Sequence, residues 1–153
     1  MTPFETAYAL WVFTSALGVV QFAAVRSNLH GLVVFRNRPR FTQAASVALV
    51  VLSFAWFFAG GDRNVPDTGD GLDGVEQARF FAIAAAAAAA VLAAVSSAVN
   101  HRWAAGNERA APAGAADPLW PPEGLDRLER ATFARAAAAR VRAVAAALSR
   151  RRR

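Results

Sequence analysis

Three long uncharged segments alternate with charged ones along the first two thirds of the chain. Residues 7–25, 43–60 and 80–99 contain 19, 18 and 20 consecutive positions without a charged residue or histidine. At a rise of about 1.5 Å per residue, helices of this length span most of a hydrocarbon core about 30 Å thick. The pattern predicts an all-α integral membrane protein with three transmembrane helices.

The first and third segments each allow an alternative interpretation. A cleaved signal peptide would carry a basic region before its apolar stretch, whereas the one charged residue before position 7 is Glu5. The third segment contains the uninterrupted alanines 84–90, which would also suit a helix in a soluble bundle. Two stronger spans and flanking charge boundaries favour the membrane. Because alanine gains little from lipid, we expect this third helix to depend on close packing and to be the most buried.

The two connections between these spans have opposite charge. The first contains Arg26, Arg36, Arg38 and Arg40, and Pro39 is expected to stop any helix there. The second, an acidic loop at 61–79, is rich in glycine and proline, which predicts irregular structure.

Basic residues in short loops remain on the cytoplasmic side, which predicts an orientation for all three spans. The first connection and the C-terminal part should be cytoplasmic, and the N-terminus and the loop 61–79 external. Cytoplasmic segments then contain 15 basic and 5 acidic residues, and external segments contain 2 basic and 6 acidic residues. We therefore expect a multi-pass protein of the plasma membrane with its N-terminus outside.

The last third of the chain changes composition after the three-helix transmembrane domain 1–103. Residues 104–122 have the Ala, Gly and Pro content of a linker. Residues 123–153 predict a basic, weakly amphipathic cytoplasmic helix with Asp126 and Glu129 in its first turns. A helical wheel places one set of residues on an apolar side: Phe133, Ala137, Val141, Val144 and Leu148. The opposite side holds Arg127, Arg135 and Arg142, so this helix suits either a membrane surface or a protein partner.

The net charge of +6 would ordinarily raise the question of nucleic-acid binding. Here the charge is divided between the two sides of the predicted membrane, so it reports orientation, and we expect no nucleic-acid partner. Arginines near a membrane surface attract anionic lipid headgroups by about 1 kcal/mol each. The candidates for contact with anionic lipid or a partner protein are Arg36, Arg38, Arg40, Arg135 and Arg142.

The acidic loop offers one candidate metal site. Asp67, Asp70 and Asp73 recur every three residues among glycines, and carboxylate oxygens are the ligands that calcium prefers. The spacing differs from the alternating ligands of an EF-hand. A solvated acidic loop explains the same composition, so both interpretations remain open.

Few polar groups lie inside the predicted spans. Gln21, Ser96 and Ser97 are predicted to form interhelical hydrogen bonds, because amides and hydroxyls in hydrocarbon require partners. His30 and His101 fall at span boundaries without a neighbouring acid and are interpreted as ordinary side chains. The spans contain no Asp, Glu, Lys, Arg or His, the chain contains no cysteine, and common catalytic motifs are absent. We therefore expect neither an enzyme nor a cofactor.

These features favour a small accessory or assembly subunit of a larger membrane complex. It would associate with another membrane protein or with itself through the third span and the basic tail. The alternative is a homo-oligomeric pore or carrier for an ion or small solute, although its spans would be expected to be more polar.

Overall fold

The computed structural model describes residues 3–60, 73–103, 128 and 131–151, and this part of the chain contains helices and turns but no strand. The helices are α1 (Pro3–Arg26), α2 (Pro39–Ala59), α3 (Gly74–Val99) and α5 (Phe133–Arg151). The first three are each long and apolar enough to cross a membrane. The predicted all-α class and the three candidate spans are confirmed, and together they indicate a multi-pass membrane protein.

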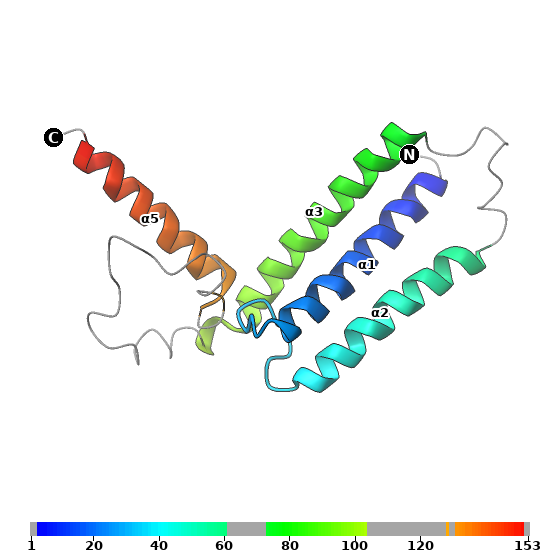
Figure 1. Cartoon of the computed structure of the whole chain (residues 1–153), viewed down its shortest axis with the longest axis horizontal. Coiled ribbons are helices and arrows are strands. Elements are labelled where there is room, and N and C mark those ends of the chain that lie inside the picture. The colour runs from blue at the N-terminus through cyan, green and yellow to red at the C-terminus, as the bar shows by residue number, and fades with distance from the viewer. Residues whose placement is uncertain (1–2, 61–72, 104–127, 129–130, 152–153) are drawn as a thin grey trace.

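The three apolar helices lie in a row with α1 in the middle (Figure 1). α1 packs against both neighbours, whereas the described helices α2 and α3 do not pack against each other. We expected the third helix to be the most buried. In its most apolar stretch 33% of the residues are buried, against 22% in the corresponding stretches of α1 and α2, so α3 is the most buried of the three by this measure. The central helix of the row, however, is α1.

Two of the helix starts differ from the sequence-based boundaries. Pro39 does not stop a helix but is its first residue, because the amide hydrogen that proline lacks has no partner in a first turn. α3 begins at Gly74, inside the predicted loop 61–79. The Asp73 carboxylate accepts a hydrogen bond of 2.7 Å from the Glu76 amide and so caps the helix. The part of the predicted irregular loop from Gly74 onward is therefore helical.

The C-terminal helix also begins later than predicted. Ala131 and Thr132 are not helical, and α5 starts at Phe133. Asp126 and Glu129, which were expected in its first turns, lie outside the described residues. The predicted linker 104–122 and Arg127 lie outside the described residues.

The helix ends divide into two groups of opposite charge. The C-termini of α1 and α3 and the N-terminus of α2 meet at one end, shown at the bottom of Figure 1. We call this the arginine-rich end, defined by Arg26, Arg36, Arg38, Arg40 and Arg102. The opposite end carries Glu5, Asp73 and Glu76.

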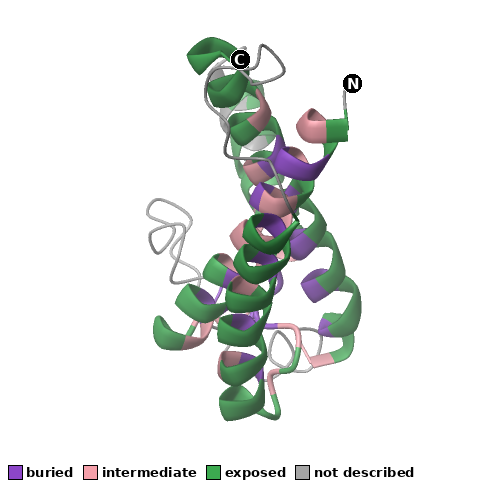
Figure 2. Cartoon of the chain, turned by 90° about the vertical axis from the view of Figure 1, so that its right-hand side faces the viewer, coloured by how far each residue is buried: buried purple, intermediate pink, exposed green. Residues whose placement is uncertain are grey.

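Aromatic side chains hold α1 against α2 near the opposite end. The Trp11 ring stacks on Phe57, with centroids 4.6 Å apart and an interplanar angle of 15°. Tyr8 and Phe4 also contact Phe57 edge-on or tilted. Buried positions form narrow patches on the helix sides that face a neighbour, and most of the remaining surface is exposed (Figure 2).

Candidate functional site

The middle of the α1–α2 interface depends on small residues. Gly18 is buried, and a Cβ atom at this position would lie 2.7 Å from Val50 Cγ2 and 2.8 Å from the Ser46 carbonyl oxygen. One turn away, the Ser15 and Ser53 hydroxyls are 2.7 Å apart and share a hydrogen bond. Close backbone approach at small residues, supported by hydroxyl contacts, is typical of helix pairs in membranes.

At the arginine-rich end, the connection 27–38 folds back against the helices. Its entry is fixed by a Schellman motif, in which the Leu29 amide donates to the Ala24 carbonyl and the Asn28 amide to the Val25 carbonyl. Asn28 has a φ of 56°, the left-handed conformation that this motif requires and that asparagine tolerates. The chain therefore leaves α1 in a defined direction.

Gln21 connects α1 to this returning segment. Its Nε2 donates to the Leu32 carbonyl at 2.8 Å, and its Oε1 accepts from the Val34 amide at 3.3 Å. Gln21 was predicted to bond to another helix; the partner is instead the backbone of the connection 27–38, which lies beside it. Both ends of the amide are satisfied by one short segment.

The other two helices hold the same segment. Asn100, at the end of α3, donates from Nδ2 to the Val33 carbonyl at 2.8 Å and to the Ser96 carbonyl at 3.0 Å. Thr42, in α2, donates to the Phe35 carbonyl at 3.1 Å. We call this arrangement the polar junction: Gln21, residues 31–35, Thr42 and Asn100. Sequence reasoning missed Asn100, whose signal was an amide side chain directly after a predicted span.

The two serines of α3 have different roles. Ser96 is fully buried and donates to the Ala93 carbonyl of its own helix at 3.3 Å. The Ser97 hydroxyl accepts a hydrogen bond of 3.1 Å from the Ala134 amide, which is one of the first-turn donors of α5 that lack a partner within the helix. Ser97 therefore caps α5 from another helix.

A second contact holds the chain just before α5. The Gly31 amide donates to the Leu128 carbonyl at 2.6 Å. A Cβ atom at position 31 would overlap the Ala131 carbonyl oxygen, so only glycine allows this approach. The start of α5 is thus attached both to α3 and to the polar junction.

The candidate arginines lie on the connection 27–38, in the first turn of α2 and on α5. The Arg36 guanidinium lies 4.5 Å from the centre of the Trp103 ring, which joins the connection 27–38 to the end of α3. Arg38 and Arg40 are exposed beside it. On α5, Arg142 donates from Nε to the Ala138 carbonyl at 3.3 Å and is exposed, and Arg135 is half-buried.

The remaining sequence candidates have simpler positions. Asp73 caps α3, while Asp67 and Asp70 lie outside the described residues, so the metal-site hypothesis stays a prediction. His101 is exposed and contacts the Ala98 carbonyl through Nδ1 at 3.1 Å. His30 lies near Trp103, with ring centres 6.4 Å apart.

The side of α3 that faces away from α1 exposes a row of alanines. The buried positions of the helix, such as Ala84 and Ala88, face α1. On the other side, every fourth residue is an exposed alanine. We call this row the outer ridge of α3: Ala82, Ala86, Ala90, Ala94 and Ala98. It extends along about 24 Å of the helix, at the spacing by which helix ridges pack into grooves.

Comparison with protein-family models, with curated proteins and with solved structures finds no match for this chain. The case for a function therefore depends on the polar junction, the outer ridge of α3 and α5.

Proposed function

We propose that this chain is a non-enzymatic subunit of a membrane assembly, and that the outer ridge of α3 packs against a transmembrane helix of a larger membrane protein. The observation that carries the proposal is the unbroken exposed alanine row on α3. Alanine methyl groups gain little from contact with lipid, whereas a flat row of them lets a second helix backbone approach closely.

The arrangement of the three helices supports the same proposal. α3 packs on α1 alone among the apolar helices, so it stands at the edge of the row with one side open. The other edge, α2, exposes large apolar residues such as Leu52, Phe54 and Phe58. α3 also exposes large apolar residues, among them Phe81, Ile83 and Val91, but they lie outside the outer ridge. Large apolar side chains suit lipid, so the proposal gives lipid contact to α2 and to these positions of α3, and protein contact to the outer ridge alone.

We also propose that the arginine-rich end is cytoplasmic and that the protein resides in the plasma membrane. Five described arginines, Arg26, Arg36, Arg38, Arg40 and Arg102, gather at one end of the helix row, as the positive-inside rule requires of cytoplasmic segments. The anionic inner leaflet would attract these side chains.

Cysteine cross-linking tests the proposed contact directly, since the chain has no native cysteine. Ala90→Cys places one thiol in the middle of the outer ridge. Ala48→Cys is the matched control, an exposed alanine on the side of α2 that faces away from α1. Each variant is expressed in its native membrane and treated with a short bifunctional thiol reagent, and the products are separated by mass.

The proposal expects a product from Ala90→Cys that is heavier than two copies of the chain, and no such product from Ala48→Cys. A product of two copies alone would replace the partner with a homo-oligomer, the arrangement that a pore or carrier requires. Equal products from both positions, or none from Ala90→Cys, would contradict assembly through the ridge.

A further inference from the structure

We infer that α5 is a membrane-surface helix, which lays its apolar side on the anionic headgroup layer at the arginine-rich end of the same molecule. This inference does not depend on the proposed assembly through α3. It follows from three observations about α5: its exposed apolar side, its attachment point and its charge.

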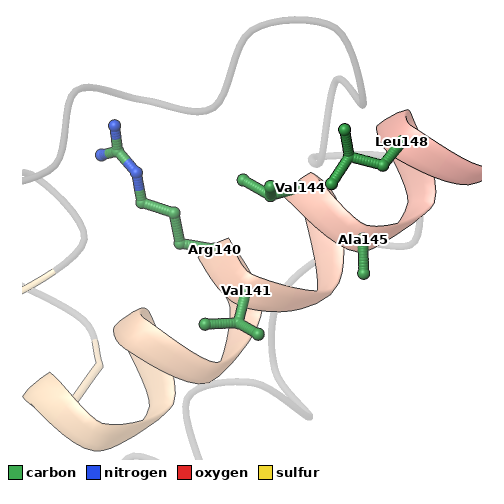
Figure 3. Close-up of a pocket in the computed structure, with 5 residues that line it drawn as sticks. All are labelled: Arg140, Val141, Val144, Ala145 and Leu148. Atoms are coloured by element: carbon green, nitrogen blue, oxygen red, sulfur yellow. The ribbon is translucent and has the colours of Figure 1, made fainter. Parts of the chain in front are cut away.

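The apolar side of α5 is uncovered. Val141, Val144 and Leu148 are 68%, 53% and 59% exposed. Figure 3 shows Arg140, Val144 and Leu148 along one side of the helix and Val141 and Ala145 on the neighbouring side, where together they line a shallow open groove. A continuous apolar strip of this kind is unfavourable in water and matches the buried face of an interfacial helix.

The attachment of α5 places this strip at membrane level. Ser97 caps its first turn from the last turn of α3, and Gly31 holds the segment before it. Both contacts lie at the arginine-rich end, where the three apolar helices would leave the hydrocarbon core. From this point α5 runs crosswise to the row of helices (Figure 1), which is the direction of the membrane plane.

The charge of α5 selects an anionic surface. Its described side chains include Arg135, Arg140 and Arg142 and no carboxylate. Arg140 borders the apolar strip, so its guanidinium can reach headgroups while its stem contacts acyl chains. Arg135 and Arg142 lie on the opposite side of the helix, about one helix diameter from the apolar strip. This distance is close to the Debye length of about 8 Å at physiological salt, so their attraction to anionic headgroups is only partly screened.

Vesicle reconstitution of the full chain tests the inference. Ala137→Cys on the apolar side and Ala139→Cys on the arginine side are each labelled with the same environment-sensitive dye. The vesicles contain phosphatidylcholine alone or mixed with phosphatidylglycerol, and each carries a nitroxide quencher on the lipid acyl chain. No other protein is present, so quenching reports contact with lipid.

In anionic vesicles, we expect quenching at position 137 to exceed that at position 139 by about threefold or more. We expect the excess to fall in neutral vesicles and in high salt, where the Debye length shrinks to about 3 Å. Equal quenching at the two positions, or none at 137, would overturn the inference in favour of a protein partner for the strip. Equal quenching at 137 in neutral and anionic vesicles would overturn the anionic-lipid specificity.

Ser97→Ala separates the attachment from the lipid contact. Without the cap, α5 keeps its apolar strip but loses one contact that fixes its start. We expect quenching at position 137 to persist and quenching at position 139 to rise as the helix rolls. Unchanged values at both positions would show that Ser97 does not orient α5.

Discussion

Gly18 fixes how closely α1 and α2 approach each other. Its missing side chain lets the Ser46 carbonyl lie where a Cβ atom would clash, and a backbone oxygen cannot move without shifting the helix. The Ser15–Ser53 contact depends on the same short distance between the helices. Small residues at this crossing therefore provide both the van der Waals contact and the polar contact of the pair.

Gly18→Ala should destabilise the protein by about 1–3 kcal/mol, because the added methyl group forces α1 and α2 apart. The free energy of unfolding can be measured by SDS titration in mixed micelles. Ala23→Leu is the control, since Ala23 is exposed on the same helix and the larger side chain meets no neighbour. A Gly18→Ala variant as stable as the control would contradict close packing at this crossing.

For single polar residues, the sequence predicts that a hydrogen bond is needed but not which group provides it. A polar side chain buried in an apolar segment requires a hydrogen bond, which we predicted to be interhelical for Gln21, Ser96 and Ser97. Of these three, Ser97 is the one bonded to another helix. The partner is not predictable from this rule, because any nearby carbonyl or amide satisfies it. Gln21 bonds to a returning loop and Ser96 to its own helix, and both positions depend on tertiary packing.

Among the elements, the connection 27–38 contributes more to the structure than its length indicates. α1, α2 and α3 each donate a side chain to its backbone, through Gln21, Thr42 and Asn100. Backbone groups close to an apolar core require such partners, because unsatisfied groups there are costly. Through these hydrogen bonds the connection 27–38 holds the ends of α1, α2 and α3 together, and it also positions the start of α5.

Gln21→Leu should weaken the attachment of the connection 27–38 to α1. The substitution leaves the Val34 amide and the Leu32 carbonyl without their partner, a loss of about 1–3 kcal/mol for each buried group. Hydrogen–deuterium exchange at the Val34 amide should accelerate about tenfold or more.

Thr14→Val is the matched control for this prediction. The Thr14 hydroxyl donates only to carbonyls of its own helix, those of Leu10 and Trp11, and does not contact the connection. Exchange at Val34 should be unchanged in this variant. Similar exchange rates in both variants would show that Gln21 does not hold the segment.

Helix centres were predictable and helix ends were not, for physical reasons. A membrane span can be recognised from composition, because a helix needs about 20 apolar residues to cross the hydrocarbon core. Each end depends instead on local capping, such as the Asp73 carboxylate before α3 or Pro39 at the start of α2. The glycines and acidic residues that indicated a loop also suit the first turn of a helix, so the boundary was placed too late.

For the whole molecule, the order of the helices could not be read from hydropathy. All three apolar helices satisfy the same length and composition rule, and the rule says nothing about which one lies in the middle. Gly18 brings α1 close to α2, and the buried cluster of Ala7, Tyr8 and Val12 includes both Phe57 of α2 and Ala84 of α3. A row with α3 at its edge leaves the outer ridge of α3 open.

The orientation of the row is the remaining prediction at this scale. Ser27 lies at the arginine-rich end and Val75 at the opposite end, and both are exposed. We expect a membrane-impermeant maleimide to label Val75→Cys on intact cells and to label Ser27→Cys only after permeabilisation. The five arginines at one end resist translocation across the membrane far more strongly than the few charges at the opposite end. The arginine-rich end is therefore expected to remain in the cytoplasm.

Each cysteine position is the control for the other, because each is expected to react with the maleimide from one side of the membrane alone. The reverse labelling pattern would contradict the cytoplasmic assignment and would place the α5 surface on the outer leaflet. Labelling of both positions on intact cells would contradict an odd number of crossings between them, since α2 is the one described helix between Ser27 and Val75 that could span a membrane. The expected pattern requires both that α2 crosses the membrane and that the arginines remain inside.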